Sequence, residues 1–228
     1  MAVPVETFVR ELTGSHRVVV LGGLAVIAHG LSRHTQDADV WLEPMASAEQ
    51  WAAVVEGVCY RVRGTTAHRL PGWTEVSGAA LAEAADETGV VRICGLSVPL
   101  DIFRRPNEFL ELEFDEVAAR AHRNADGSLL PDPIDLIQSK QSTGRDKDRY
   151  DIQHLESLVR ADYRRQLPTA TLAEAAALLG RYSDWEVLQS ALENPAPEVR
   201  ELALSHLREF AAEGDPFSLA ILEGRTLP

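Results

Sequence analysis

Residues 20–42 read VLGGLAVIAHGLSRHTQDADVWL, and this stretch decides the fold. The apolar run that ends at Gly22-Gly23 predicts a buried strand followed by a tight turn. Residues 24–30 then predict a short helix, and residues 38–42 predict a second strand that is apolar except for one acid. Strand, glycine turn, helix and strand in this order indicate a sheet with helices packed on it.

Two acids, Asp37 and Asp39, stand at the start of the second strand, two positions apart, so both side chains leave the same face. Neighbouring carboxylates repel each other unless they are protonated or bridged by a cation, and Mg²⁺, or Mn²⁺ in its place, suits oxygen ligands. A third acid, Asp101, lies inside another apolar run and needs a partner. Asp-x-Asp alone is more often structural or solvated. Behind a Gly-Gly turn it favours a site in which three aspartates hold two ions about 3.5–4 Å apart.

The rest of the chain divides into a mixed first part and a helical second part. In the first part we expect a helix over 47–58, a third strand over 59–62, a short helix near 79–85 among loops, and strands over 90–93 and 96–103. Further helices are expected over 113–122, 133–140, 146–160, 171–179, 184–192 and 197–212. The fold class is therefore α+β: a mixed β-sheet flanked by helices over residues 1–130, followed by a helical domain over residues 131–228.

The composition is that of a globular protein that does not rely on disulfides. The 228 residues carry 35 acidic and 22 basic side chains, a formal net charge of -13, and 45% are hydrophobic. Cys59 and Cys94 have no metal-ligand spacing, and residues 1–13 lack the apolar core of a signal peptide, so a reduced, cytoplasmic protein is expected. No apolar run approaches the roughly 20 residues of a membrane span. The acidity argues against coating nucleic acid by charge alone, but it allows a nucleotide held through metal ions.

Separate motifs in a fixed order carry a resemblance to a known family. The string 22–39, with its Gly-Gly, His-Gly and Arg-x-Thr-x-Asp-x-Asp elements, resembles the signature of the nucleotidyltransferase superfamily, which has the polymerase-β-like fold. Within that superfamily it most resembles the AbiEii-like branch, which includes toxins of bacterial toxin–antitoxin and phage-defence systems. A basic motif follows at 135–140 (DLIQSK) and 145–151 (RDKDRYD). The resemblance spans about residues 18–158 and does not cover the last helices.

That resemblance implies roles for individual residues. The residues implied to hold the metal ions and to carry catalysis are Asp37, Asp39 and Asp101, the last as a third metal ligand or as a base toward an acceptor hydroxyl. The residues implied to contact the nucleotide are Gly22, Gly23, Arg33, Thr35, Lys140, Asp148 and Asp151. Lys140 would contact the triphosphate or the base, with one of the two acids after it holding it in place; which of the two points inward stays open. Arg33 suits either a brace for the γ-phosphate or a loop surface, and a solvated set of ion pairs is the alternative for the whole basic motif.

The leading functional hypothesis is a Mg²⁺-dependent nucleotidyltransferase, in which an acceptor hydroxyl attacks the α-phosphate of an NTP and pyrophosphate leaves. The resemblance to toxins implies a tRNA or protein acceptor and an antitoxin partner. The alternatives are an aminoglycoside-like small-molecule transferase, whose acidic walls would attract a cationic substrate, and a non-catalytic nucleotide-binding module. Acids outnumber bases after Pro168, which is unlike an RNA-binding surface. Trp41 and Trp73 are more readily interpreted as core or cleft wall than as base-stacking platforms.

Overall fold

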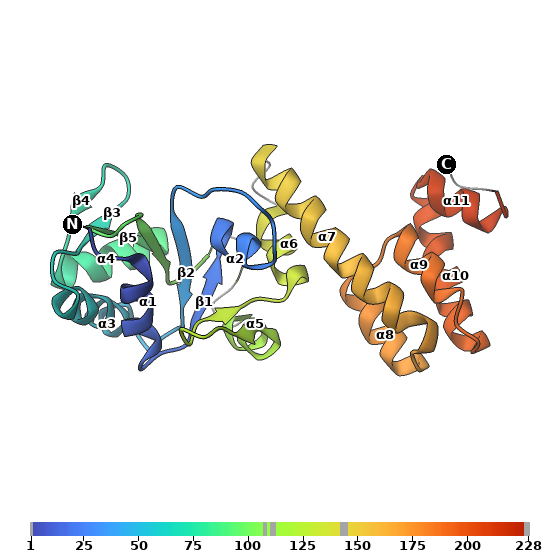
Figure 1. Ribbon diagram of the computed structural model, residues 1–228, viewed down its shortest axis with the longest axis horizontal. Helices are drawn as coiled ribbons and strands as arrows, with labels where there is room; N and C mark the ends of the chain where they lie inside the picture. The colour runs from blue at the N-terminus through green and yellow to red at the C-terminus, as the bar shows by residue number, and fades with distance from the viewer. Residues whose placement is uncertain (1, 107–108, 110–112, 142–145, 226–228) are drawn as a thin grey trace. The chain divides into compact units, whose positions relative to one another are not determined.

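The chain forms two compact units, which comprise residues 1–155 and 156–228. The computed structural model describes residues 2–106, 109, 113–141 and 146–225. The first unit holds a mixed sheet with helices and the second is helical, so the fold class is α+β, as predicted (Figure 1). The boundary predicted at residues 130/131 coincides with the end of the last sheet strand, and as a domain boundary it stays a prediction.

The first unit is built on an eight-stranded sheet with the order β4-β3-β5-β6-β2-β1-β8-β7. The strands β2 and β6 pair in parallel, as do β1 and β8, and the remaining neighbours are antiparallel. The strands are β1 (Val18–Leu21), β2 (Ala38–Leu42), β3 (Thr66–Arg69), β4 (Thr74–Glu75), β5 (Val90–Cys94), β6 (Leu100–Phe103), β7 (His122–Arg123) and β8 (Leu129–Leu130).

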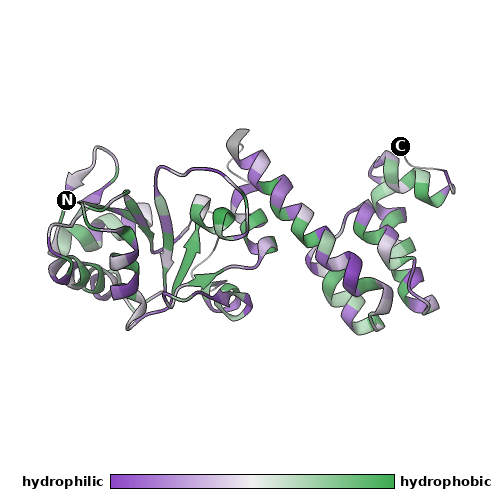
Figure 2. Ribbon diagram, viewed as in Figure 1, coloured by the Kyte–Doolittle hydropathy of each residue, from purple (hydrophilic) through white to green (hydrophobic). Residues whose placement is uncertain are grey.

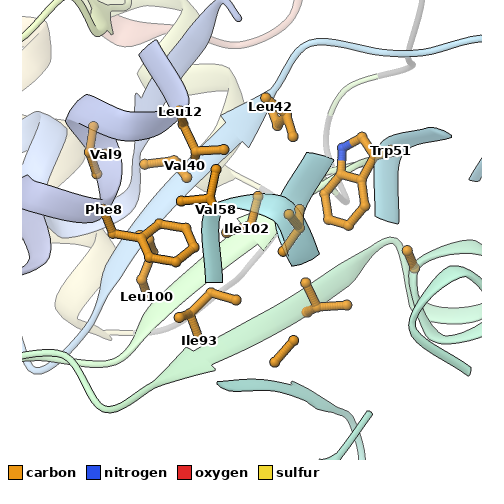
Figure 3. Close-up of a cluster of buried hydrophobic side chains, with 14 of the residues drawn as sticks. Phe8, Val9, Leu12, Val40, Leu42, Trp51, Val58, Ile93, Leu100 and Ile102 are labelled. Carbon is orange, nitrogen blue, oxygen red and sulfur yellow. The ribbon is translucent and has the colours of Figure 1, made fainter. Parts of the chain in front are cut away.

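One face of this sheet is covered by three helices, α1, α3 and α4 (Figure 1). Phe8 of α1 and Trp51 of α3 are buried against strand residues such as Val40, Ile93 and Ile102 (Figure 3). Burial of such side chains stabilises the fold by about 1.5–3 kcal/mol each. The helices of this unit are α1 (Val5–Thr13), α2 (Gly22–Ala28), α3 (Ala48–Arg61), α4 (Gly78–Thr88), α5 (Phe114–Arg120), α6 (Pro133–Gln141) and the first part of α7 (Asp146–Gln166).

The opposite face of the sheet is only partly apolar. Strand residues alternate between the two faces, so Val40 and Leu42 of β2 point toward α1 and α3, while Asp39 and Trp41 point the other way. Trp41 is completely buried there, with ring centroids 5.3 Å from Phe109 and 5.0 Å from Phe114. The polar side chains of this face are therefore gathered on a part of the sheet that α1, α3 and α4 do not cover.

The structure confirms some of the helices and strands predicted from the sequence and corrects others. Strand β2 has the bounds expected from its apolar run. The third strand expected over 59–62 is wrong, because these residues continue helix α3 to Arg61, with Val62 buried beyond its end. The buried residues Val55 and Val58 of α3 and Val62 just after it keep the three- and four-residue spacing of one helix face. The stretch read as loops around a short helix also contains β3 and β4.

The second unit comprises the end of α7 and five short elements. These are η2 (Leu167–Thr169), α8 (Leu172–Arg181), α9 (Trp185–Ala191), α10 (Pro197–Ala212) and α11 (Pro216–Leu222). Asn194 is buried and its Nδ2 donates to the carbonyl oxygens of Leu167 (2.6 Å) and Ala170 (2.9 Å). Helix α11 was not expected; Asp215 caps it by accepting from the Ser218 amide at 2.8 Å.

The hydropathy of the helices follows from this packing. Figure 2 shows apolar residues concentrated on the sheet strands and helices with alternating polar and apolar faces, as amphipathic helices on a core require. Among the residues that the structure describes, no helix combines the length and the apolar character needed to cross a membrane.

Candidate active site

Three charged side chains form a row across the partly open face of the sheet. Arg92 of β5 pairs with Asp101 of β6, and Asp101 pairs with Asp39 of β2. Directly paired residues project from the same face, so the three side chains lie side by side. Asp37 immediately precedes β2 and lies near the row, with one carboxylate oxygen 3.9 Å from Arg92 Nη2.

The Gly-Gly turn at the start of α2 is packed against the aspartate region. Gly22 has a φ of +59°, and a Cβ on it would lie 1.8 Å from Asp39 Oδ2. A Cβ on Gly23 would lie 2.7 Å from Thr35 Oγ1 and 2.9 Å from Arg33 Nη2. Both glycines are therefore required by the close approach of side chains from residues 33–39, whatever else the turn binds.

Lys140 on α6 is held by both acids of the basic motif. Its Nζ lies 2.8 Å from Asp151 Oδ2 and 3.3 Å from Asp148 Oδ1, and Asp151 also accepts from Arg33 Nη2 at 2.8 Å. Both acids point inward, because Asp148 is 2% exposed and Asp151 is 0% exposed. Asp151 Oδ1 and Arg33 Nε are buried and have no hydrogen-bond partner among the described residues. Of the same motif, residue 145 and the side chain of residue 147 fall outside the part that the structure describes.

Arg92 is a site residue that sequence reasoning missed. Its Nε and Nη2 donate to the two carboxylate oxygens of Asp101, each at 2.6 Å. These hydrogen bonds raise the pKa of Arg92 above its ordinary value. The guanidinium carbon also lies 3.9 Å from the ring centroid of Trp73. The signal in the sequence was a lone charge inside the apolar run 90–94, but its partner is set by strand register, which the run does not reveal.

A cavity of about 400 Å³ joins these groups. All the predicted site residues line it except Asp151, which lies against Lys140. The described residues that line it are Leu21, Gly22, Gly23, Arg33, Thr35, Asp37, Asp39, Leu70, Trp73, Arg92, Asp101, Phe103, Pro106, Ser139, Lys140 and Asp148. Folding also joins side chains that are distant in the sequence: Arg33, which lines the cavity, contacts Asp151, 118 residues away.

The atoms at this cavity that could bind a metal ion are carboxylate oxygens. Among the described residues, no group of three or more His, Cys, Asp or Glu side chains is placed to hold a metal ion together. Asp101 directs both of its oxygens at Arg92, whereas Asp37 and Asp39 line the cavity beside it. A pair of carboxylates suits Mg²⁺, which keeps several waters and is completed by substrate phosphates. The metal-binding roles of the three aspartates stay predictions.

Comparison with known proteins gives a distant structural likeness only. No protein-family model and no curated protein matches the chain. Among solved structures, the fold is similar to a crystal structure from H. pylori described as a "putative nucleotidyltransferase", with a TM-score of 0.40 and 16% sequence identity. The match covers 92% of this chain and 95% of that one. So distant a likeness assigns no activity, and the functional argument therefore rests on the site.

Proposed function

We propose that this protein is a divalent-cation-dependent nucleotidyltransferase that moves a nucleoside monophosphate from an NTP to a hydroxyl acceptor. One observation carries the proposal: Asp37 and Asp39, the Gly22-Gly23 turn and the cation Lys140 line the same cavity. In this reaction the acceptor hydroxyl gives up its proton to a base or to water, and its oxygen bonds to the α-phosphorus. The bond from that phosphorus to the oxygen that bridges to the β-phosphate breaks, and pyrophosphate leaves.

The residues that would hold the divalent ion are Asp37 and Asp39. The fit is supported by the Gly22 position, where the lack of a Cβ leaves room for the Asp39 carboxylate against the turn. When bound, a Mg²⁺ or Mn²⁺ ion supplies positive charge that offsets the charge developing on the reacting phosphate. Asp101 is the sequence-based candidate for a third ligand or a base; each of its oxygens accepts one hydrogen bond from Arg92 and keeps a second lone pair for either role.

The residues that would bind the triphosphate are Arg33 and Lys140, the two cations on the α6–α7 side of the cavity. Buried carboxylates fix both: Asp151 contacts each of them at 2.8 Å, so neither cation needs to be ordered when a nucleotide enters. Fixed charges in a partly enclosed site stabilise developing negative charge more effectively than mobile surface lysines do.

The acceptor is proposed on the AbiEii-like resemblance of residues 22–39 and 135–151, which favours tRNA or a protein hydroxyl and a toxin paired with an antitoxin. The acidic balance of the chain supports the alternative of a small cationic acceptor. A non-catalytic nucleotide-binding module is the remaining alternative, and loss of transfer in a metal-site variant separates it from an enzyme.

The test is transfer of label from NTPs labelled at the α-phosphate, with Mg²⁺ and a cell lysate fractionated into RNA, protein and small molecules. We expect Asp39→Asn to lower transfer and pyrophosphate release at least about 100-fold while circular dichroism stays unchanged. Asp115→Asn makes the same chemical change at a side chain that is 76% exposed and does not line the cavity, so it should stay within about twofold of wild type. Undiminished pyrophosphate release by the purified Asp39→Asn protein would refute the proposal.

A further inference from the structure

One aromatic side chain at the cavity is exposed in a way that core packing does not explain. Trp73 is 38% exposed, while Trp41 and Trp51 are completely buried. It lies in the β3–β4 connection and lines the cavity that holds the candidate phosphate and metal groups. Of the exposed large hydrophobic side chains among the described residues, which also include Tyr60 and Tyr150, Trp73 alone lines this cavity.

The backbone at Trp73 is held in a conformation that a large side chain rarely adopts. Its φ is +53°, in the left-handed region, and a residue there persists only when the surroundings fix it. The Trp73 carbonyl oxygen lies 2.8 Å from Nδ1 of His68. A carbonyl oxygen only accepts, so Nδ1 carries the proton, and Nε2 lies 2.9 Å from the Thr66 hydroxyl. The imidazole thus links the connection to β3.

The ring of Trp73 is fixed from one side by a cation. The Arg92 guanidinium lies over it at 3.9 Å from the centroid, and Asp101 holds that guanidinium with two hydrogen bonds. The guanidinium therefore covers one ring face, and 38% of the residue is nevertheless exposed and available to a second planar partner. The lining of the same cavity also includes apolar side chains, namely Leu21, Leu70, Phe103 and Pro106.

We infer that Trp73 is the stacking platform for the nucleobase of the bound nucleoside triphosphate, an inference that rests on the proposed function. The lining contains two kinds of side chain: carboxylates and cations suit the metal ion and the phosphates, while Trp73 and the apolar side chains suit the flat, weakly polar base. Every base has a π-face, and stacking on an aromatic ring tolerates all of them. Trp73 therefore contributes affinity to all four NTPs and selects none strongly.

The test compares NTPs with a probe that has the phosphates but no base. Wild-type protein is titrated with ATP, GTP, CTP and UTP, and with tripolyphosphate, each with Mg²⁺, by calorimetry and tryptophan fluorescence. We expect Trp73→Ala to raise the Kd of every NTP about 5- to 150-fold, the range of base–aromatic stacking, and to leave the tripolyphosphate Kd within twofold. Trp73→Phe keeps a smaller ring and should lose less affinity than Trp73→Ala.

Fluorescence locates the effect. Nucleotide should quench wild-type fluorescence, and the quenching should disappear in Trp73→Phe. It should persist in Trp185→Phe, the matched control, whose tryptophan stacks on Phe217 in the second unit. Quenching that survives in Trp73→Phe, or an unchanged NTP Kd in Trp73→Ala, overturns the inference.

Two further outcomes also count against Trp73 as the NTP base platform. Equal loss of NTP and tripolyphosphate affinity in Trp73→Ala means that the ring acts on the phosphate groups through Arg92. Quenching by a triphosphate-free trinucleotide, with the NTP Kd unchanged in Trp73→Ala, means that the ring serves an acceptor base. The two proposals fail separately: Trp73-dependent NTP binding without transfer to any acceptor refutes only the proposed function, and transfer with an unchanged KM in Trp73→Ala refutes only the inference.

Discussion

The close contact between the glycine turn and Asp39 makes Gly22→Ala a sharp test of the site. Alanine at a φ of +59° costs about 1–2 kcal/mol in the free energy of unfolding because its Cβ crowds the following carbonyl. The new Cβ would also lie 1.8 Å from Asp39 Oδ2, and the shortest separations that real Cβ atoms show are near 3.0 Å. The carboxylate oxygen must therefore recede by about 1.2 Å, and a displacement of about 1 Å is enough to cost about 100-fold in rate.

Gly78→Ala is the matched control for the backbone term. Gly78 has a φ of +52°, and a Cβ on it would meet nothing within 4 Å. Backbone strain should lower the free energy of unfolding of both variants by the same 1–2 kcal/mol, seen as a drop in Tm of about 2–8 °C for a unit of this size. Only Gly22→Ala should also lose about 100-fold in kcat/KM for nucleotidyl transfer.

The assay is nucleotidyl transfer at saturating Mg²⁺, with thermal unfolding of both variants in parallel. If Gly22→Ala keeps the activity of Gly78→Ala, the contact between the turn and Asp39 has no part in catalysis and the reasoning fails. If Gly78→Ala is as inactive as Gly22→Ala, the loss reflects the fold rather than the position of the Asp39 carboxylate, and this outcome also contradicts the prediction.

Three other perturbations follow from the ion pairs and the buried phenol. Arg92→Gln removes the cation of the carboxylate row, so calorimetry should show Mg²⁺ binding about tenfold tighter; unchanged Mg²⁺ affinity would contradict this. Asp151→Asn should lower the free energy of unfolding in urea by about 3–5 kcal/mol because it removes the fully buried carboxylate that pairs with both Arg33 and Lys140, whereas the exposed control Asp162→Asn should change it by less than about 0.5 kcal/mol. Burial and the hydrogen bond to Asp184 raise the pKa of Tyr182 above its usual 10.0, so this contribution to stability is full below pH 10 and falls as the pH rises above it. Tyr182→Phe should lessen this fall. If the free energy of unfolding falls equally steeply between pH 8 and 11 in wild type and Tyr182→Phe, the prediction is contradicted.

The fold was predictable from sequence where a pattern is local. The apolar run of β2 and the proline-initiated helix α10 have the bounds that their sequences predict. Strands β3 and β4 were not found, because TAHR and TE carry no apolar run and are defined by pairing with each other and with β5. Short polar strands such as these depend on neighbours distant in the sequence, which periodicity does not report.

The site residues also fall into those that a local pattern predicts and those that depend on strand pairing. Asp37, Asp39 and the Gly-Gly turn stand close together in the chain, so their spacing was enough to bring them to notice. The bidentate Arg92–Asp101 pair requires the register of β5 against β6, set by the 95–99 connection, and one residue of slip would turn Arg92 to the other face. The structure also gives the glycines a second role: they make room for side chains of residues 33–39, in addition to the nucleotide contact that the resemblance implies.

The charges around the cavity determine in what form a nucleotide enters. Among the described residues, five carboxylates line or back it, and three cations do. The cations are Arg33, Arg92 and Lys140, and each already contacts a carboxylate. The excess is two negative charges, which repels a bare triphosphate and equals the charge of one divalent ion. Nucleotide and ion should therefore bind together: with EDTA no NTP should bind, and by linkage each NTP should tighten Mn²⁺ binding by the factor with which Mn²⁺ tightens NTP binding. NTP binding of undiminished affinity in EDTA would show that Arg33 and Lys140 hold the phosphates without an ion, and the roles proposed for Asp37 and Asp39 would have to be abandoned.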